Sequence, residues 1–267
     1  MGRLMVPHVL VAVAALIVSA LTLFSGFGLG TLLLPVFALF MSVEMAVAAT
    51  SVVHGANNVL KLFVVGKHAE RSLVLKVGIP AVLAAFAGAG LLGVVSRFGE
   101  ILSYRIGNRD AVITPIKLVM ALLMVAFALL ELLPRLRDLK FDRKYLVLGG
   151  LLSGFFGGLS GHQGALRSAF LAKVGISKEG FVGTNAVIGF LVDLARIPIY
   201  LILLLKGRGS SEIDTSQWPL VVTGVAFAFA GVFLGSKLLH VVTLRTVQNL
   251  TGGLLLLIAI GLGTGVL

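Results

Sequence analysis

Ser25-Gly26-Phe27-Gly28-Leu29-Gly30 is a glycine-rich break inside an otherwise apolar stretch, and Ser160-Gly161-His162-Gln163-Gly164 is a second break at the matching place in the other half of the chain. In a lipid bilayer, irregular backbone is tolerated only where protein or a water-filled cavity satisfies its polar groups. A break that occurs at corresponding positions of two halves is typical of a binding site between two repeats of a membrane protein. The two breaks therefore indicate both an internal repeat and a binding site between its halves.

The composition predicts a helical membrane protein. Of the 267 residues, 58% are hydrophobic and 12% are charged, and the mean hydropathy is +1.08. A helix needs roughly 20 residues to cross about 30 Å of hydrocarbon. Six apolar blocks approach or exceed this length and are expected to cross the membrane: residues 44–65, 73–95, 112–133, 178–205, 218–238 and 244–264. The expected fold class is an all-α polytopic membrane protein.

Charge and cysteine content exclude several classes of function. The net charge is +11, but Lys and Arg lie in short connections between apolar blocks, without the interleaved aromatic residues of a nucleic-acid groove. We therefore predict no nucleic-acid partner. With no cysteine, the chain has no disulfide, thiolate metal site or thiol nucleophile. No catalytic residue, metal or cofactor is predicted, and the first apolar stretch is interpreted as part of the fold because it lacks a cleavage site followed by a polar mature domain.

The basic connections predict the orientation in the membrane, because positively charged connections stay in the cytoplasm. Lys67, Arg71 and Lys76 lie in one such connection, and residues 134–144 form the densest basic one. The loop of residues 97–110 and the C-terminus are then expected outside.

Two segments are predicted to form re-entrant hairpins broken at the glycine-rich stretches. Residues 145–173 begin and end near basic, cytoplasmic residues, and as one helix they would span about 43 Å, too long for one crossing and too short for two. The same reasoning predicts a hairpin for residues 7–41 that enters from the outside, although its first arm is long enough to cross. Each hairpin is followed by three crossings, and because three is odd, the two halves have opposite orientations.

The sequence thus predicts two inverted membrane repeats, residues 1–133 and 145–267, joined by a basic cytoplasmic linker of residues 134–144. Similar residues recur in the same order in both halves, which supports a repeat. Thr50-Ser51 matches Thr184-Asn185 at a separation of 134 positions, Gly30 matches Gly164, and Phe86-Ala87-Gly88 matches Phe229-Ala230-Gly231.

A helix that starts at a mid-membrane break directs free backbone N–H groups and a partial positive charge into the break, which favours anions. Glycine lets the backbone turn there and lets a ligand approach without a Cβ in the way. Alternatively, these glycines only let helices pack closely. The predicted substrate-binding residues of the breaks are Ser25, Gly26, Gly28, Gly30, Ser160, Gly161, His162, Gln163 and Gly164.

Arg167 lies within one turn of Gly164 and offers a forked, charge-assisted donor suited to an oxoanion. The alternative is that its side chain reaches the cytoplasmic interface, since Lys173 is only about 9 Å further along a helix. Arg167 is included among the predicted substrate-binding residues.

Polar residues also interrupt the apolar helices that follow the breaks. Thr50, His54, either Asn57 or Asn58, and Lys61 have the spacing of one helix face, which must point into the protein. Such residues either contact the substrate or only hydrogen-bond helices to one another. The predicted substrate contacts on these helices are Thr50, Ser51, His54, Asn57, Asn58, Thr184 and Asn185.

Three further intramembrane groups are titratable or charged. Asp193 and Arg196 are spaced to pair on one helical turn, and a structural ion pair is favoured over a proton relay. His54 and His162 either couple transport to protons or serve as hydrogen-bonding struts. A coupling proton or sodium ion therefore stays a possible partner, and no oligomeric state is predicted.

Several of these motifs together resemble the TauE/SafE family of sulfite exporters over nearly the whole chain. They are the break with Gly30 five residues before Pro35, the Ala49-Thr50-Ser51 motif, the polar stretch that ends in Asn57-Asn58, and a divergent second copy. The resemblance implies a protein of the bacterial cytoplasmic membrane that exports sulfite, a sulfonate or a related oxoanion. It also implies that the two breaks and the Thr-Ser and Thr-Asn positions build the site. The second copy departs from the family pattern in having His162-Gln163 in its break and Arg167 beyond it.

The expected function is secondary transport of a small anion by alternating access, with the lipid bilayer and the anion as partners. No Walker A motif is present, so an ion gradient or the gradient of the substrate must supply the energy. A passive anion channel is one alternative. An intramembrane serine hydrolase is another, because Gly158-Leu159-Ser160-Gly161 has the form GxSG; such an enzyme would need a histidine from a later helix, and His240 falls in a basic loop.

Overall fold

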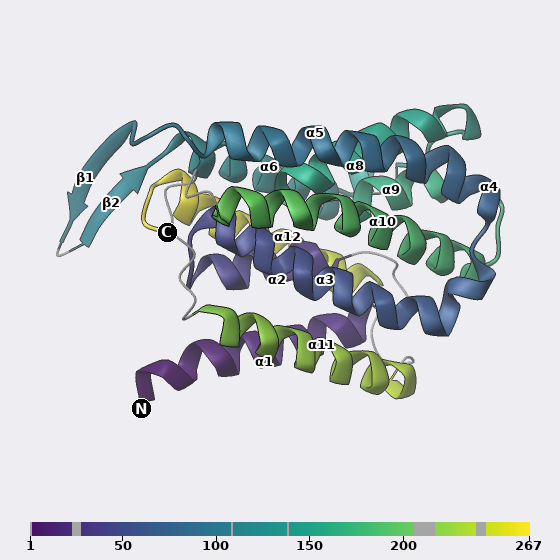
Figure 1. Ribbon diagram of the computed structural model, residues 1–267, viewed down its shortest axis with the longest axis horizontal. Helices are drawn as coiled ribbons and strands as arrows, with labels where there is room; N and C mark the ends of the chain where they lie inside the picture. Colours follow the sequence, from purple (N-terminus) through teal and green to yellow (C-terminus); the bar gives the residue numbers. More distant parts are fainter. Residues whose placement is uncertain (1, 23–27, 108, 138, 206–216, 239–243) are drawn as a thin grey trace.

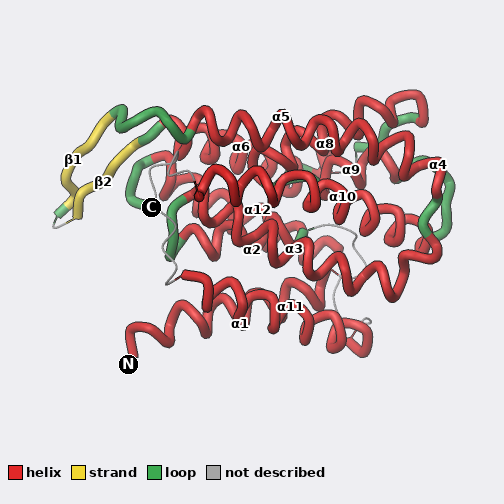
Figure 2. The backbone as a smooth tube through the Cα atoms, viewed as in Figure 1, coloured by secondary structure: helices red, strands yellow, loops and turns green. Residues whose placement is uncertain are grey.

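The computed structural model describes residues 2–22, 28–107, 109–137, 139–205, 217–238 and 244–267. The described chain is a bundle of helices that run roughly along the longest axis of the molecule, with a small β-hairpin projecting from one end (Figure 1). The same view coloured by secondary structure shows how little of the chain is neither helix nor strand (Figure 2). The longer helices are α1 (Gly2–Thr22), α2 (Leu29–Ala38), α3 (Val43–Val65), α5 (Ile79–Val95), α6 (Pro115–Leu132), α8 (Leu146–Ser160), α9 (Gly164–Leu171), α10 (Lys178–Leu205), α11 (Trp218–Leu238) and α12 (Leu244–Gly263).

Within the described residues, five helical segments are long and apolar enough to cross a membrane, which agrees with an all-α membrane protein. They are Met5–Thr22, Arg71–Val95, Pro115–Leu132, Lys178–Leu205 and Trp218–Gly235. Four of them match predicted crossings, and the fifth is the first arm of the predicted N-terminal hairpin.

The other two predicted crossings, residues 44–65 and 244–264, also form helices, but they are not among these five. Polar residues lower the hydropathy of α3, whereas the apolar part of α12, Gln248–Gly263, is shorter than the other spans. Seven polar or charged side chains occur in α3 from Glu44 to Lys61, and Arg245, Gln248 and Asn249 begin α12.

The predicted external loop contains an element that the sequence analysis missed. Two strands, β1 (Leu102–Ile106) and β2 (Arg109–Ile113), form an antiparallel hairpin. The predicted crossing at 112–133 therefore begins only at Pro115, because Val112 and Ile113 belong to the strand. The Tyr104 hydroxyl donates to the carbonyl of Thr264 at 2.5 Å, so the hairpin and the C-terminus lie at the same end of the molecule, as the charge pattern required (Figure 1).

The opposite end carries the basic connections. Glu70, Lys76, Arg143 and Val174 line one open cavity there. The two basic connections predicted to share the cytoplasmic side therefore lie at one end of the bundle.

Glycines let four helices of the bundle approach one another closely. Helix α8 packs on α5, and α11 packs on α1. A Cβ at Gly154 or Gly158 of α8 would collide with backbone carbonyls of α5, and one at Gly231 or Gly235 of α11 would collide with those of α1. A Cβ at Gly150 would collide with the carbonyl of Val77, just before α5. Because lipid removes the hydrophobic driving force between helices, their association depends on close van der Waals packing, which small residues allow. Close packing is thus the role of these glycines, and two further contacts, α3 with α10 and α6 with α12, complete the bundle.

Candidate functional site

The second break lies where two helices end and begin. Helix α8 stops at Gly161, whose φ of 82° is left-handed and favours glycine, and α9 starts at Gly164 after only two residues. In the first break, Gly28 has a φ of 110° and precedes α2 directly. Ser25 and Gly26 lie outside the described residues. Both breaks therefore redirect the chain through a glycine that permits a positive φ.

The two breaks meet inside the protein. Gly30, in the first turn of α2, is buried. A Cβ built on Gly30 would lie 3.4 Å from the carbonyl oxygen of Gly161 and 3.6 Å from Cδ2 of His54. Since the first N–H groups of a helix have no partner within it, the N-terminus of α2 directs donors into the region between the breaks.

Arg167 of α9 points into this same interior and is 1% exposed. Its Nε donates to Oδ1 of Asn185 at 2.8 Å, and its Nη1 donates to Oε1 of Gln163 at 2.9 Å. Both partners are neutral, and within the described part of the chain no carboxylate forms an ion pair with Arg167. The alternative in which Arg167 reaches the cytoplasmic interface is wrong, because amide acceptors from the break and from α10 hold the side chain inside.

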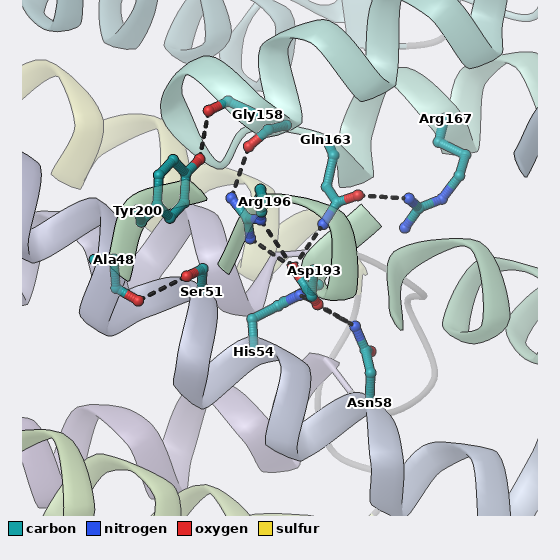
Figure 3. Close-up of polar contacts among 11 residues, drawn as sticks. Ala48, Ser51, His54, Asn58, Gly158, Gln163, Arg167, Asp193, Arg196 and Tyr200 are labelled. Atoms are coloured by element: carbon teal, nitrogen blue, oxygen red, sulfur yellow. Dashed lines mark hydrogen bonds and ion pairs between the residues drawn. The ribbon is translucent and has the colours of Figure 1, made fainter. Parts of the chain in front are cut away.

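Asp193 of α10 organises the polar groups around the breaks (Figure 3). Its Oδ2 lies 2.6 Å from Nδ1 of His54 and accepts from Nδ2 of Asn58 at 3.0 Å. Its Oδ1 accepts from Nε2 of Gln163 at 3.3 Å and from Nη2 of Arg196 at 2.7 Å. One carboxylate therefore connects α3, the second break and α10.

Arg196 and Tyr200 bind the end of α8 to α10. The Nη1 of Arg196 donates to the carbonyl of Gly157 at 2.6 Å, and the Tyr200 hydroxyl donates to the carbonyl of Gly158. These carbonyls belong to the last turn of α8, where intrahelical donors run out. The structural ion pair predicted between Asp193 and Arg196 is confirmed, and Arg196 also caps the helix that ends at the break.

The absence of a side chain at Gly189 of α10 lets side chains of α3 and α9 pack close to its backbone. A Cβ at this position would lie 3.0 Å from Nδ2 of Asn58, 3.2 Å from Nη2 of Arg167 and 3.6 Å from Cε1 of His54. The three side chains thus converge on the surface of this glycine. Gly189 was not among the predicted site residues, although it lies 134 positions after Gly55, whose Cβ position would be 3.4 Å from Cβ of Asp193.

Other predicted site residues form hydrogen bonds elsewhere. Thr184 accepts from the backbone N–H of Glu70, and Ser51 donates to the carbonyl of Ala48. The amide oxygen of Asn57 accepts from Ser19 of α1 at 2.6 Å. Thr50 is buried, and its hydroxyl has no hydrogen-bond partner in the described chain. The predicted residues that the structure brings together at the breaks are Gly30, His54, Asn58, Gly161, Gln163, Gly164, Arg167 and Asn185.

The sequence model of the family described as Sulfite exporter TauE/SafE matches residues 11–262. The chain belongs to this family. No curated protein and no solved structure matches the chain. Membership in a TauE/SafE transporter family, together with the apolar helices, identifies an integral membrane protein and is consistent with a protein that is not an enzyme.

The GxSG serine has a neighbour that bears on the hydrolase alternative. The Ser160 hydroxyl lies 3.0 Å from Nδ1 of His162 and 3.1 Å from the carbonyl oxygen of Phe156, to which it donates. The His162 ring stacks on Phe127, and its Nε2 has no hydrogen-bond partner in the described residues. A catalytic histidine is oriented by a third group, and the described chain supplies none to His162. His240 lies outside the described residues. In this member of the TauE/SafE family, the hydrogen bonds of Ser160 are therefore those of a residue that stabilises the turn.

Proposed function

We propose that this protein is a secondary transporter that exports a small sulfur-containing oxoanion, such as sulfite or a sulfonate, across the bacterial cytoplasmic membrane. The substrate binds between the two breaks, at Arg167 and the N-terminus of α2. The observation that carries this proposal is the buried guanidinium of Arg167, whose hydrogen-bond partners among the described residues are the neutral amides of Gln163 and Asn185. The family supports the substrate class.

The charge balance around Arg167 favours an anionic ligand. A buried ion without a counter-charge costs several kcal/mol, because no water remains to solvate it. The carboxylate of Asp193 is already paired with Arg196, and Lys61, another buried cation, donates to the carbonyl of Thr22. A bound anion supplies the negative charge that Arg167 lacks.

The shape of the site fits an oxoanion. Gly30 lies beside Gly161 and His54, and Gly189 lies beside His54 and Arg167, so no Cβ of these glycines stands in the way of the anion oxygens in the proposed site. The N–H groups at the start of α2 and Nη2 of Arg167 donate to different oxygens, and such charge-assisted hydrogen bonds are about twice as strong as neutral ones.

Alternating access follows from an inverted repeat, which we propose on the basis of the helix pairing. If α1 corresponds to α8, α3 to α10, α5 to α11 and α6 to α12, then the contact between α5 and α8 corresponds to that between α11 and α1. Exchanging the two halves leaves the contact between α3 and α10 unchanged, and likewise the contact between α6 and α12. In a transporter of this kind, the two halves rock around a fixed central site, here the junction of the two broken hairpins.

The test is flux into liposomes that contain the purified protein. We expect saturable uptake of at least one anion from a panel of labelled sulfite, sulfate, thiosulfate and methanesulfonate, with competition from unlabelled substrate. Arg167→Gln keeps the hydrogen bond to Asn185 within reach but removes the charge, and should abolish uptake. Arg71→Gln, at an exposed position, is the matched control and should transport normally.

Counterflow separates the carrier from a channel. A carrier loaded with unlabelled substrate accumulates label transiently against its gradient, whereas a channel does not. Uptake without saturation or counterflow would mean that the protein is a channel rather than a carrier. Normal uptake by Arg167→Gln would mean that the anion does not bind at the proposed site.

A further inference from the structure

The orientation of the His54 ring places its two nitrogens in different surroundings. The ring carbon Cδ2 faces Gly30 and the break, at 3.6 Å from the Cβ position of that glycine, and Cε1 faces Gly189 at 3.6 Å from its Cβ position. In an imidazole ring, Nε2 is bonded to both of these carbons. Nε2 therefore lies on the ring edge between the carbon beside Gly30 and the carbon beside Gly189, and the Cβ position of Gly189 is also 3.2 Å from Nη2 of Arg167.

The other nitrogen of His54 is already engaged. Nδ1 lies 2.6 Å from Oδ2 of Asp193 (Figure 3). Asp193 is held as a carboxylate by Nε and Nη2 of Arg196, which donate to its Oδ1 at 3.0 and 2.7 Å. A carboxylate only accepts, so Nδ1 carries the hydrogen, and the hydrogen bond at Nδ1 determines the state of the other nitrogen. Nε2 is then a lone pair in the neutral ring and an N–H donor in the imidazolium.

We propose that His54 is the proton-binding site of the transporter, and that its Nε2 takes up one proton together with the anion and releases it with the anion on the other side. This inference rests on the proposed anion site between the breaks. In the empty site, the neutral ring presents a lone pair. When the anion enters, a proton from the same aqueous compartment forms the Nε2–H bond, and this group donates to an anion oxygen. The proton comes from hydronium, whose O–H bond breaks as the Nε2–H bond forms, and water is left behind.

The surrounding charges explain why proton and anion bind together. Asp193 faces His54 from α10 as its anionic partner, whereas Arg196 of α10, Arg167 of α9 and Lys61 of α3 add positive charge to the same region. A second positive charge on His54 is unfavourable beside Arg167 in the empty site and becomes favourable when an anion lies between them. Asn58 and Gln163 contribute no charge, but both donate to Asp193 and hold the carboxylate against the ring.

The experiment measures how anion affinity changes with pH in the purified, full-length protein. The probes are labelled sulfate and methanesulfonate, whose own charge stays constant between about pH 5 and 8, the range in which histidine titrates. If one proton binds with the anion, affinity falls about tenfold per pH unit on the alkaline side of the transition. His54→Gln cannot gain a charge and should give a flat profile, and His54→Arg, which is always charged, should also lose the pH dependence.

His162 provides the matched control, because it is buried and adjacent to the break but has its ring against Phe127. His162→Gln should keep the pH dependence of the wild type. Proteoliposomes with a pH dye inside should show one proton entering per anion in the wild type and in His162→Gln, and none in His54→Gln.

The possible outcomes distinguish failure of the proton site at His54 from failure of the proposed anion transport. A wild type that binds anion with a flat pH profile, or a His54→Gln variant that keeps the slope, overturns the proton site and leaves the anion site intact. Loss of the slope in His162→Gln alone moves the proton site to that residue and overturns the role of His54. If the wild type binds neither probe, nor sulfite or thiosulfate, at any pH, the proposed function fails and this inference fails with it.

Discussion

The substitution Gly189→Ala tests the geometry of the site with a single methyl group. The new Cβ would lie 3.0 Å from Nδ2 of Asn58 and 3.2 Å from Nη2 of Arg167, closer than the 3.4–4 Å of ordinary contact. Both groups must therefore move by a few tenths of an ångström. Hydrogen bonds hold Nε and Nη1 of Arg167. The group that moves is therefore Nη2, which faces the anion in the proposed site.

The expected loss is one charge-assisted hydrogen bond to the anion, about 1.5–3 kcal/mol, which is roughly a 10- to 100-fold increase in Kd. Stability should not fall in parallel, because alanine in a helix interior is favoured over glycine by about 1 kcal/mol, which offsets the crowding.

The assay is anion binding to purified protein in detergent, with a thermal unfolding curve for each variant. Gly90→Ala is the control, because Gly90 also lies within a helix but nothing lies within 4 Å of its Cβ position. This control should bind anion like the wild type. An affinity of Gly189→Ala within about threefold of the wild type would refute the position of the anion beside Arg167 Nη2, since a factor of three is below 1 kcal/mol.

Three further substitutions have defined outcomes. Gly30→Leu places a side chain against Gly161 and His54, so it should block flux in liposomes while the protein remains monodisperse; normal flux would reduce Gly30 to a packing residue. Gly154→Leu should prevent recovery of folded protein from membranes, because even its Cβ would collide with the Ala81 carbonyl of α5. Arg196→Ala leaves the carboxylate of Asp193 short of its main partner and should destabilise the protein by about 3–5 kcal/mol in detergent unfolding; unchanged stability would contradict its structural role.

The fold class followed from the sequence because a membrane imposes simple requirements on length and hydropathy. The segments at 73–95, 178–205 and 218–238 are apolar over the length of a crossing, and all three are helices. The β-hairpin was missed because the alternation of Leu102 to Ile106 is short and lies in a charged loop, where nothing in the sequence indicates its contact with Thr264.

The candidate site was predictable where it depends on local backbone and less so where it depends on tertiary contact. The glycines of the breaks are readable because a positive φ favours glycine, as at Gly28 and Gly161. The ion pair of Asp193 with Arg196 follows from helical spacing. The contact of Asp193 with His54 does not, because it joins residues 139 positions apart.

Arg167 shows the limit most clearly. Its position after the break suggested a ligand-binding role, but the interface remained an equally simple destination for a long cationic side chain. Only the two amide acceptors, Gln163 and Asn185, place it in the interior. Gly189 could have been noticed as the repeat equivalent of Gly55, but its meaning depends on which side chains of other helices converge on it.

The most direct test of the central claim is equilibrium binding of labelled sulfite to purified wild-type protein and to Arg167→Gln, both shown to be folded by thermal unfolding. Truncating one partner of a buried charge pair costs about 2–5 kcal/mol, so the variant should bind at least about 30-fold more weakly than the wild type. Equal saturable affinity in the two proteins would contradict the assignment of the anion to Arg167.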